Sequence, residues 1–263
     1  MEMLTGLTFL RMLKTDLVKY YRKTFWDDLI NKSIWVGCVL IISTYIWPHV
    51  GMSEQFGLFM AIGSLVSCSF WDAWGVTAQF VSDLTGSREI DYYITLPIPS
   101  WVFFIKQMVF YTVRSMASAW IMIPLSKLIL GARLDLWSIS YGKFILIFIM
   151  TNIFCSTLSL LMTSLVKNMD TIDNVSVRFL FPMWFFGGSQ FSWMTFYAAA
   201  PLFAYLNLCN PLVYAMEAMH VAFLGQEHYL PFWVCILMLC VFSGICGYIG
   251  TRRLIRQLDC VRS

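Results

Sequence analysis

Long apolar runs, separated by short polar connections, dominate the pattern along this chain. About 20 consecutive apolar residues are needed to cross the hydrocarbon core of a bilayer. Runs of this kind predict spans at residues 33–50, 56–81, 101–130, 139–166, 175–195 and 230–250. The pattern therefore predicts an all-α integral membrane protein with six transmembrane helices in a single domain, residues 1–263.

The residues before the first run follow a different pattern. Over residues 1–32, apolar positions such as Leu10, Leu13 and Leu17 recur at helical spacing, while cations such as Arg11 and Lys14 fall mainly on the other side. This is typical of a basic amphipathic helix that lies along a membrane surface. An ordinary packing helix of a soluble region is the alternative.

A second departure from the run pattern precedes the last span. Residues 198–224 are apolar, but Pro201, Asn210 and Pro211 interrupt them. Irregular backbone at membrane depth is tolerated where protein or water covers it, so we expect a broken, re-entrant segment on the outer side. Glu217 and His220 lie three residues apart, on one helical face, and are candidates for an outer gate. Two such ligands predict neither a metal site nor a catalytic pair.

Composition supports membrane residence. The chain is 59% hydrophobic and 13% charged, whereas a soluble domain has about 25% charged residues. The net charge of +3 is too mild to indicate a nucleic acid partner.

The placement of the cations predicts the orientation, because cytoplasmic flanks collect Lys and Arg. They gather in residues 1–32 and at the C-terminus, whereas the first and fifth connections between spans have none. We expect a multi-pass protein of the inner, cytoplasmic membrane with both termini in the cytoplasm. The connection 131–138 departs from the rule, since it contains Arg133.

The connection 82–99 is the longest expected on the cytoplasmic side. Its polar positions and its exposed apolar positions fit a short helix that contacts a partner, and Pro97 and Pro99 end that helix. A solvated loop is the alternative. The candidate contact residues are Asp83, Arg88, Glu89, Ile90, Asp91, Tyr92, Tyr93 and Leu96.

Ionisable residues within spans usually face a bundle interior or water. Arg114 lies about 20 Å along the helix from Trp101, at 1.5 Å per residue. Either it pairs with a neighbouring span, or it lines a substrate path. Asp72 falls near the inner interface, where a structural role is favoured.

Aromatic residues are dense between positions 179 and 197. Interfacial belts explain many of them, but Trp184, Phe185 and Phe186 lie in the middle of the predicted span. They are candidates for lining a path at a dimer interface. Packing in the core or against lipid is the alternative.

These features, taken in order, resemble one known family. The acidic segment at 82–96, the Leu-Pro-Ile turn at 96–98 and Lys106 resemble the coupling helix of type-2 ATP-binding-cassette (ABC) permeases. The C-terminal third is similar as well, with Gly187 and Gly188 before a broken segment and an Asn-Pro-Leu-Val-Tyr run at 210–214. His220 stands where many members of the family have Arg.

The resemblance implies the permease subunit of an ATP-driven exporter. It implies a second permease copy, most simply a homodimer, and two separate ATPase subunits that bind ATP and magnesium. The sequence agrees, since it has no G-x-x-x-x-G-K-[ST] phosphate loop. We therefore expect no enzyme activity and no bound cofactor in this chain.

Two other function classes remain as alternatives. An ion-coupled secondary carrier needs paired acidic residues in the middle of the membrane, and only Asp72 and Glu217 come close. A membrane-embedded enzyme that modifies lipids needs a His, Asp or Ser cluster at one interface. The three histidines, His49, His220 and His228, all lie toward the predicted outer side.

Replacing both Tyr92 and Tyr93 with Asp should uncouple transport from ATP hydrolysis, because charged groups would replace the apolar anchors of the coupling segment. The measurement is transport-stimulated ATPase activity of the reconstituted complex. Full stimulation in the double variant would contradict the assignment of residues 82–96.

Overall fold

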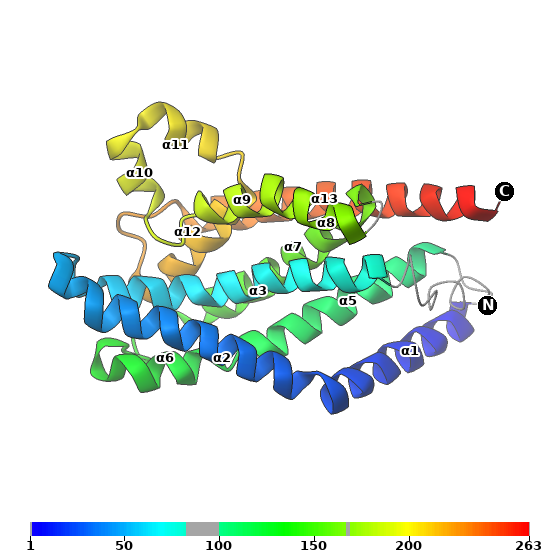
Figure 1. The fold of residues 1–263 in the computed structure, drawn as a ribbon, viewed down its shortest axis with the longest axis horizontal. Coiled ribbons are helices and arrows are strands. Elements are labelled where there is room, and N and C mark those ends of the chain that lie inside the picture. The colour runs from blue at the N-terminus through cyan, green and yellow to red at the C-terminus, as the bar shows by residue number, and fades with distance from the viewer. Residues whose placement is uncertain (1, 83–99, 167–168, 263) are drawn as a thin grey trace.

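A computed structural model of the protein describes residues 2–82, 100–166 and 169–262. In these ranges every regular element is helical. The long helices run along the longest axis of the molecule, and both termini lie at one end (Figure 1). We call this the terminal end and the opposite one the far end. The elements are α1 Glu2–Lys23, α2 Phe25–Ile41, η1 Ile42–Ile46, η2 Trp47–Val50, α3 Phe56–Ser82, α5 Ser100–Ala119, α6 Met122–Leu130, η4 Gly131–Arg133, α7 Tyr141–Leu165, α8 Met169–Val175, η5 Ser176–Leu180, α9 Phe181–Phe185, α10 Trp193–Ala199, α11 Pro201–Asn207, α12 Pro211–Leu224 and α13 Phe232–Arg262.

Five helical stretches of the described residues are long and apolar enough to cross a membrane. They match five of the six predicted spans and confirm the all-α membrane class. The first starts earlier than predicted and the last extends further. The stretches are Phe25–Val50, Phe56–Ser82, Trp101–Arg133, Tyr141–Leu165 and Phe232–Arg256.

The predicted helix over residues 1–32 is wrong at its C-terminal boundary. The chain bends at Thr24, so that α1 and α2 diverge in Figure 1, and α2 starts at Phe25. Backbone hydrogen bonds continue across the bend, from Thr24 to Tyr20 at 2.9 Å and from Asp28 to Thr24 at 3.0 Å. The Tyr20 and Tyr21 rings pack against Phe25 at this point. The apolar span therefore includes residues that the sequence assigned to the surface helix.

The third span bends between α5 and α6. Pro124 has no N–H to donate to the Trp120 carbonyl. The Ile123 N–H donates to that carbonyl instead, at 3.3 Å. The bend is therefore a local consequence of the proline, and the helix resumes at Met122.

The predicted span at 175–195 is wrong at its C-terminal boundary. Helical residues run through α8, η5 and α9 and end at Phe185, about 25 Å in all. The chain then turns at Gly187 and Gly188. Gly188 has φ +86, and a Cβ on Gly187 would lie 2.7 Å from Leu212 Cδ2. The two glycines end the span because the turn needs a left-handed residue and a close approach to α12.

The segment 198–224 is broken into short helices, as the sequence predicts. Pro201 and Pro211 stand in the first turns of α11 and α12. The Asn210 side chain caps α12 by accepting from the Leu212 N–H at 3.0 Å. Helices α10 and α11 stand off from the bundle in Figure 1, whereas α12 is buried from Pro211 to Phe223.

Helix α7 lies at the centre of the bundle and packs against α3, α5, α12 and α13. Its contact with α13 is close at Gly250, where an added Cβ would lie 2.8 Å from the Leu161 backbone nitrogen. Small residues at such crossings let helix backbones approach each other in membranes. The α7–α13 contact therefore requires glycine at this position.

Replacing Gly250 with Ala should lower the thermal stability of the purified protein, because the methyl group would meet backbone that cannot move aside. We expect a loss of about 1–3 kcal/mol. Gly244 of the same helix is the matched control, since a Cβ there meets nothing within 4 Å. Equal melting temperatures for Gly250→Ala and Gly244→Ala would contradict this account.

Candidate functional site

The predicted coupling residues lie outside the described residues. They are Asp83, Arg88, Glu89, Ile90, Asp91, Tyr92, Tyr93 and Leu96. The helices on either side of them, α3 and α5, pack against each other. Lys106, which follows this segment, is buried and pairs with Asp16 of α1 at 2.6 Å. Helix α1 is therefore anchored beside the start of α5.

Arg114 pairs with neighbouring helices, which is one of the two roles that the sequence left open. Its Nη2 lies 2.9 Å from Asp28 Oδ2 of α2, and its Nη1 donates to Gln79 of α3 at 3.0 Å. The guanidinium also lies over the Tyr20 ring of α1, 4.8 Å from its centroid. One side chain thus connects α5 to three other helices.

Asp72 is the centre of a second polar group. Two of its partners, on α2 and α5, lie one helical turn after Asp28 and Arg114. The Lys32 ammonium group contacts the Asp72 carboxylate and the Ser118 hydroxyl. The Ser115 hydroxyl donates to Asp72 Oδ2 at 2.9 Å. Two acidic and two basic side chains, Asp28, Asp72, Lys32 and Arg114, therefore balance each other in a charged cluster between α2, α3 and α5.

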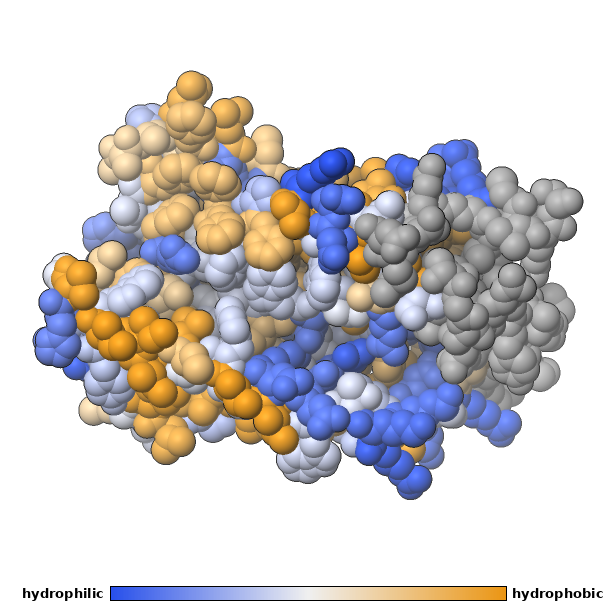
Figure 2. Space-filling view, in the orientation of Figure 1, coloured by the Kyte–Doolittle hydropathy of each residue, from blue (hydrophilic) through white to orange (hydrophobic). Residues whose placement is uncertain are grey.

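Asp28 of the charged cluster lies near the start of its apolar stretch, Phe25–Val50. Along its helix, Asp28 is about 33 Å from Val50 and Arg114 about 28 Å from Arg133. Both lengths approach the thickness of a hydrocarbon core, about 30 Å. In Figure 2 the surface over the far-end part of α2 is hydrophobic, while the surface over α1 is mostly hydrophilic. The start of α5 lies beside α1, where Lys106 pairs with Asp16.

Burial raises the pKa of the Tyr20 phenol, and the Asp28 carboxylate raises that pKa further. Tyr20 therefore stays neutral and presents a ring face to Arg114. This contact places the end of α1 against the same cluster.

Sequence reasoning missed Asp28, Lys32 and Gln79. Asp28 and Lys32 are four residues apart, on one face of α2, which is a signal that the sequence contains. The misplaced boundary at residue 32 hid it, because both residues were assigned to the surface helix and not to the first span.

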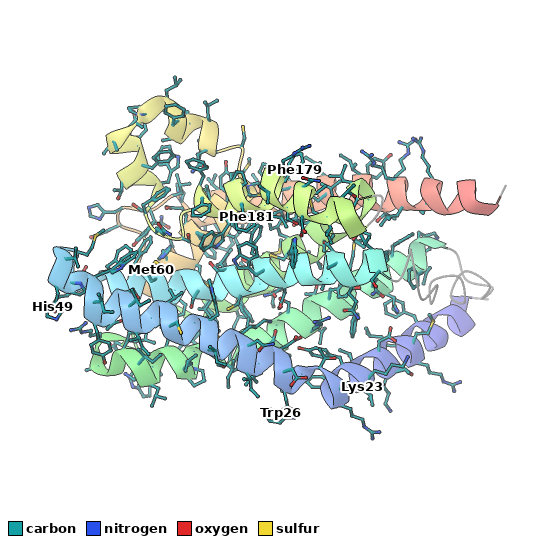
Figure 3. All side chains as sticks on the ribbon, in the orientation of Figure 1. Lys23, Trp26, His49, Met60, Phe179 and Phe181 are labelled. Atoms are coloured by element: carbon teal, nitrogen blue, oxygen red, sulfur yellow. The ribbon has the colours of Figure 1, made fainter. Side chains whose placement is uncertain are left out.

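The three predicted aromatic residues divide into one inward and two outward side chains. Trp184 is partly buried, and its indole N–H donates to Ser67 at 3.2 Å. Phe185 and Phe186 are each 52% exposed. Phe179 and Phe181, labelled in Figure 3, are exposed on the same helical segment. The outward rings form an apolar face that can contact lipid or a second protein.

Glu217 and His220 hold the far-end loops. Glu217 is buried, and its two oxygens accept from the backbone N–H of Trp193 at 2.6 Å and of Leu230 at 2.9 Å. His220 is stacked between the rings of Phe59 and Tyr229. Burial, and then the Glu217 carboxylate, raise the pKa of Tyr229 to about 12. Both predicted gate residues thus fasten loops to α12.

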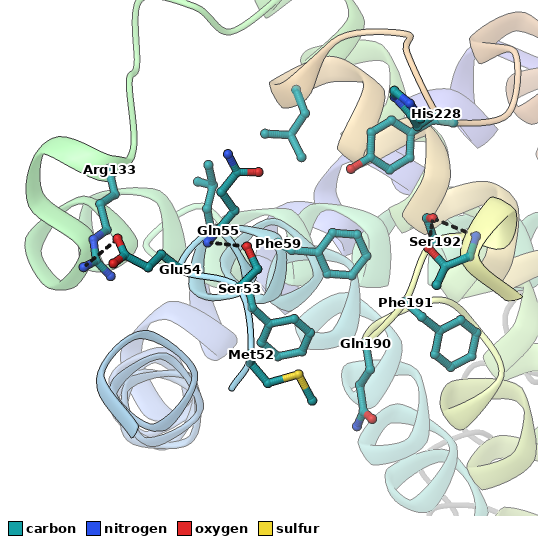
Figure 4. A pocket seen from close by; sticks show the side chains of 15 residues that line it. Met52, Ser53, Glu54, Gln55, Phe59, Arg133, Gln190, Phe191, Ser192 and His228 are labelled. Atoms are coloured by element: carbon teal, nitrogen blue, oxygen red, sulfur yellow. Dashed lines mark hydrogen bonds and ion pairs between the residues drawn. The ribbon is translucent and has the colours of Figure 1, made fainter. Parts of the chain in front are cut away.

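A cavity of about 730 Å³ opens at the far end, between the connections that follow η2, η4, α9 and α12 (Figure 4). Aromatic rings, amides and hydroxyls line it, together with the exposed ion pair between Arg133 and Glu54, 3.8 Å apart. Among the described residues, no three His, Cys, Asp or Glu side chains gather closely enough to hold a metal ion. The rings, amides and hydroxyls of the lining are groups that can bind and position a molecule.

Replacing Arg114 with Gln should destabilise the protein, because the carboxylate of Asp28 would lose its cation in a largely buried position. We expect a loss of about 1–3 kcal/mol, measured as a shift in melting temperature of the purified protein. The double variant Asp28→Asn with Arg114→Gln should recover part of it.

The exposed pair offers the matched control. Glu54→Gln removes an ion pair whose carboxylate is 81% exposed, so its effect should stay within about 1 kcal/mol. Equal losses in Glu54→Gln and Arg114→Gln would show that the charged cluster has no special role.

Comparison with known families agrees with the architecture. A family model described as ABC-2 type transporter matches residues 9–224. No curated protein matches the chain. The matched residues run from α1 through α12 and include the charged cluster, the aromatic face and the Glu217 contacts. The protein is a permease component of the ABC-2 type transporter family, integral to the membrane.

Proposed function

We propose that two copies of this permease form the substrate path of an ATP-driven exporter, with two ATPase subunits at the terminal end. The charged cluster is the observation that carries the proposal. It joins α1 to α2, α3 and α5, and the connection 83–99 links the last two of these helices. A displacement of α1 or of that connection would therefore move α2, α3 and α5 together.

The buried ion pairs would keep these helices together during such a movement. Separating Arg114 from Asp28, or Lys32 from Asp72, would leave a charge unpaired within long apolar helices, which is costly. The helices therefore move as a unit, which is what a coupling element needs. The pair between Asp16 and Lys106 adds a second link between α1 and α5.

Two copies would meet through the outward apolar side chains of η5 and α9. Val177, Phe179, Phe185 and Phe186 are each more than half exposed there. Exposed aromatic and aliphatic side chains of this kind fit either lipid or a partner. In the proposed homodimer they face the second copy and border the path.

The proposed orientation places the terminal end in the cytoplasm and the far end outside. Exposed cations on α1 and at the end of α13 support it. Two cations in or near the connection 131–138 depart from the rule that cations collect on the cytoplasmic side, and both make local contacts. Arg133 lies 3.8 Å from Glu54, and Lys127 donates to the Leu134 carbonyl at 2.7 Å. Glu54 thus partly neutralises Arg133, and the ammonium group of Lys127 is bonded to a backbone carbonyl.

ATP and magnesium would bind only in the partner subunits. The two alternatives are less well supported. Asp72 is paired with Lys32, and Glu217 is held by two backbone N–H groups, so neither carboxylate is free to carry an ion. The buried His220 ring is stacked between two aromatic rings, which suits packing better than lipid chemistry.

Co-purification with a phosphate-loop ATPase tests the proposal. We expect a complex with two copies of each chain and magnesium-dependent ATP hydrolysis. An ATPase variant without its phosphate-loop Lys is the control and should bind but not hydrolyse. Transport by the permease alone in proteoliposomes would overturn the proposal.

A further inference from the structure

Three polar side chains without a partner lie on the outward side of α8 and η5. Asp173, Asn174 and Arg178 are exposed. In the part of the chain that the structure describes, none of them makes an ion pair or a side-chain hydrogen bond. Val177 and Phe179, next to Arg178, are exposed and apolar. A charge among such neighbours in a membrane helix needs a counter-charge.

Contacts with α3 show the level of Arg178 along the bundle. Trp74 of α3 donates its indole N–H to the Ser176 hydroxyl, and the Trp71 ring lies 5.3 Å from the Phe181 ring, between centroids. Arg178 stands between Ser176 and Phe181 in its helix, so it lies level with this part of α3. The charged cluster also has its α3 member here.

Arg178 is too far from the terminal end of the bundle to find its counter-charge there. Trp74 is about 12 Å before Ser82, the last residue of α3, and an arginine side chain is shorter than this. Side chains lean toward the N-terminus of their helix, and Asp173 is about 7.5 Å away in that direction. Within one helix, however, neighbours are three or four residues apart and not five. The partner of Arg178 must therefore come from another molecule.

The spacing of these residues fits a seam between two parallel helices. Asn174, Val177 and Phe181 are all exposed and are separated by three and four residues, as are the central positions of two packed helices. Asp173 and Arg178 flank Val177 on its two sides, five residues apart. Flanking positions with this spacing meet across a parallel seam, and opposite charges there determine partner and register. A single Asn at a central position also specifies register.

A second copy of this chain would supply every missing group. Around a two-fold axis perpendicular to the membrane, the two copies of this helix run in the same direction, and each contact occurs twice. Asp173 of each copy then meets Arg178 of the other, and the two Asn174 side chains meet near the axis. A lipid phosphate would neutralise Arg178 but would leave Asp173 and Asn174 without partners.

We propose that two ion pairs between copies, from Asp173 of each to Arg178 of the other, fix the register of the homodimer. The two Asn174 amides are bonded to each other between these pairs. The inference rests on the proposed homodimer and names the residues that hold its two copies together. It gives the charged side chains of this face a role that the apolar side chains around them do not provide, because apolar contacts alone leave the register open.

An exchange of charges tests the pairs in the full-length protein, reconstituted in liposomes without ATPase. The measurement is the dimer fraction, counted by single-molecule photobleaching of tag-labelled protein as the ratio of protein to lipid falls. Arg178→Asp and Asp173→Arg should each lower the association constant roughly tenfold to hundredfold, because two pairs of like charges replace two ion pairs.

A mixture of these two variants is the decisive sample. In a mixed dimer, Asp at position 178 of one copy meets Arg at position 173 of the other, and the unchanged Asp173 and Arg178 meet in the second pair. Two-colour labelling should therefore show mixed dimers with an association constant close to that of the wild type.

Arg253→Asp in α13 is the matched control. Arg253 is exposed and, among the described residues, has no ion pair, but it lies outside α8 and η5, so the association constant should not change. Arg178→Gln is a milder variant for the case that a reversed charge hinders membrane insertion. It should weaken association roughly threefold to tenfold.

Three results would overturn the inference. They are unchanged association of the Arg178 and Asp173 variants, a loss that the mixture does not restore, and association that requires anionic lipid but not Asp173. The last result would show that a lipid phosphate holds Arg178. The wild type reports separately on the proposed homodimer. If it dimerises and the variants match it, the ion pairs fail and the homodimer stands, whereas a monomeric wild type would remove both.

Discussion

The need to neutralise charge within long apolar helices organises this protein. Asp28, Lys32, Asp72 and Arg114 come from α2, α3 and α5, and each finds its counter-charge on a different helix. An unpaired charge in such a helix would be costly, so the pairs determine how these helices pack. Helix α1 joins through Tyr20, whose ring lies under Arg114, and through Asp16, which pairs with Lys106. Helices α1, α2, α3 and α5 are thereby joined to one another through charged and aromatic side chains.

At the far end, hydrogen bonds to a buried carboxylate and stacking of rings hold the loops. There a buried carboxylate, Glu217, accepts two backbone N–H groups from separate loops, and stacked rings fill the space between them. The loops are thereby held open around a cavity while the backbone groups stay satisfied. Helix α3 connects the two ends, because it contributes Asp72 to the charged cluster and Phe59 to the stacked rings.

Much of the architecture could be predicted from local pattern. Five spans, the broken segment around Pro201 and Pro211, and the family were predicted correctly. The errors arose where local pattern is ambiguous. The bend at Thr24 has no proline or glycine to mark it, and the predicted span continued past Gly187 and Gly188 because further aromatic residues, Phe191 and Trp193, follow them. Glu217 and His220 were recognised as unusual, but their partners are loop backbone groups and a ring on α3, which no spacing rule predicts.

The sequence by itself determined membrane residence, the position of five long apolar helices and the family, because the length of an apolar run and the order of motifs are properties of the chain alone. Only the tertiary structure decided that Arg114 pairs with Asp28, that Asp72 pairs with Lys32, and that Glu217 accepts backbone N–H groups from two loops. These contacts join residues far apart in the chain. Their existence depends on which helix faces meet, and that follows from packing and charge pairing over the whole bundle.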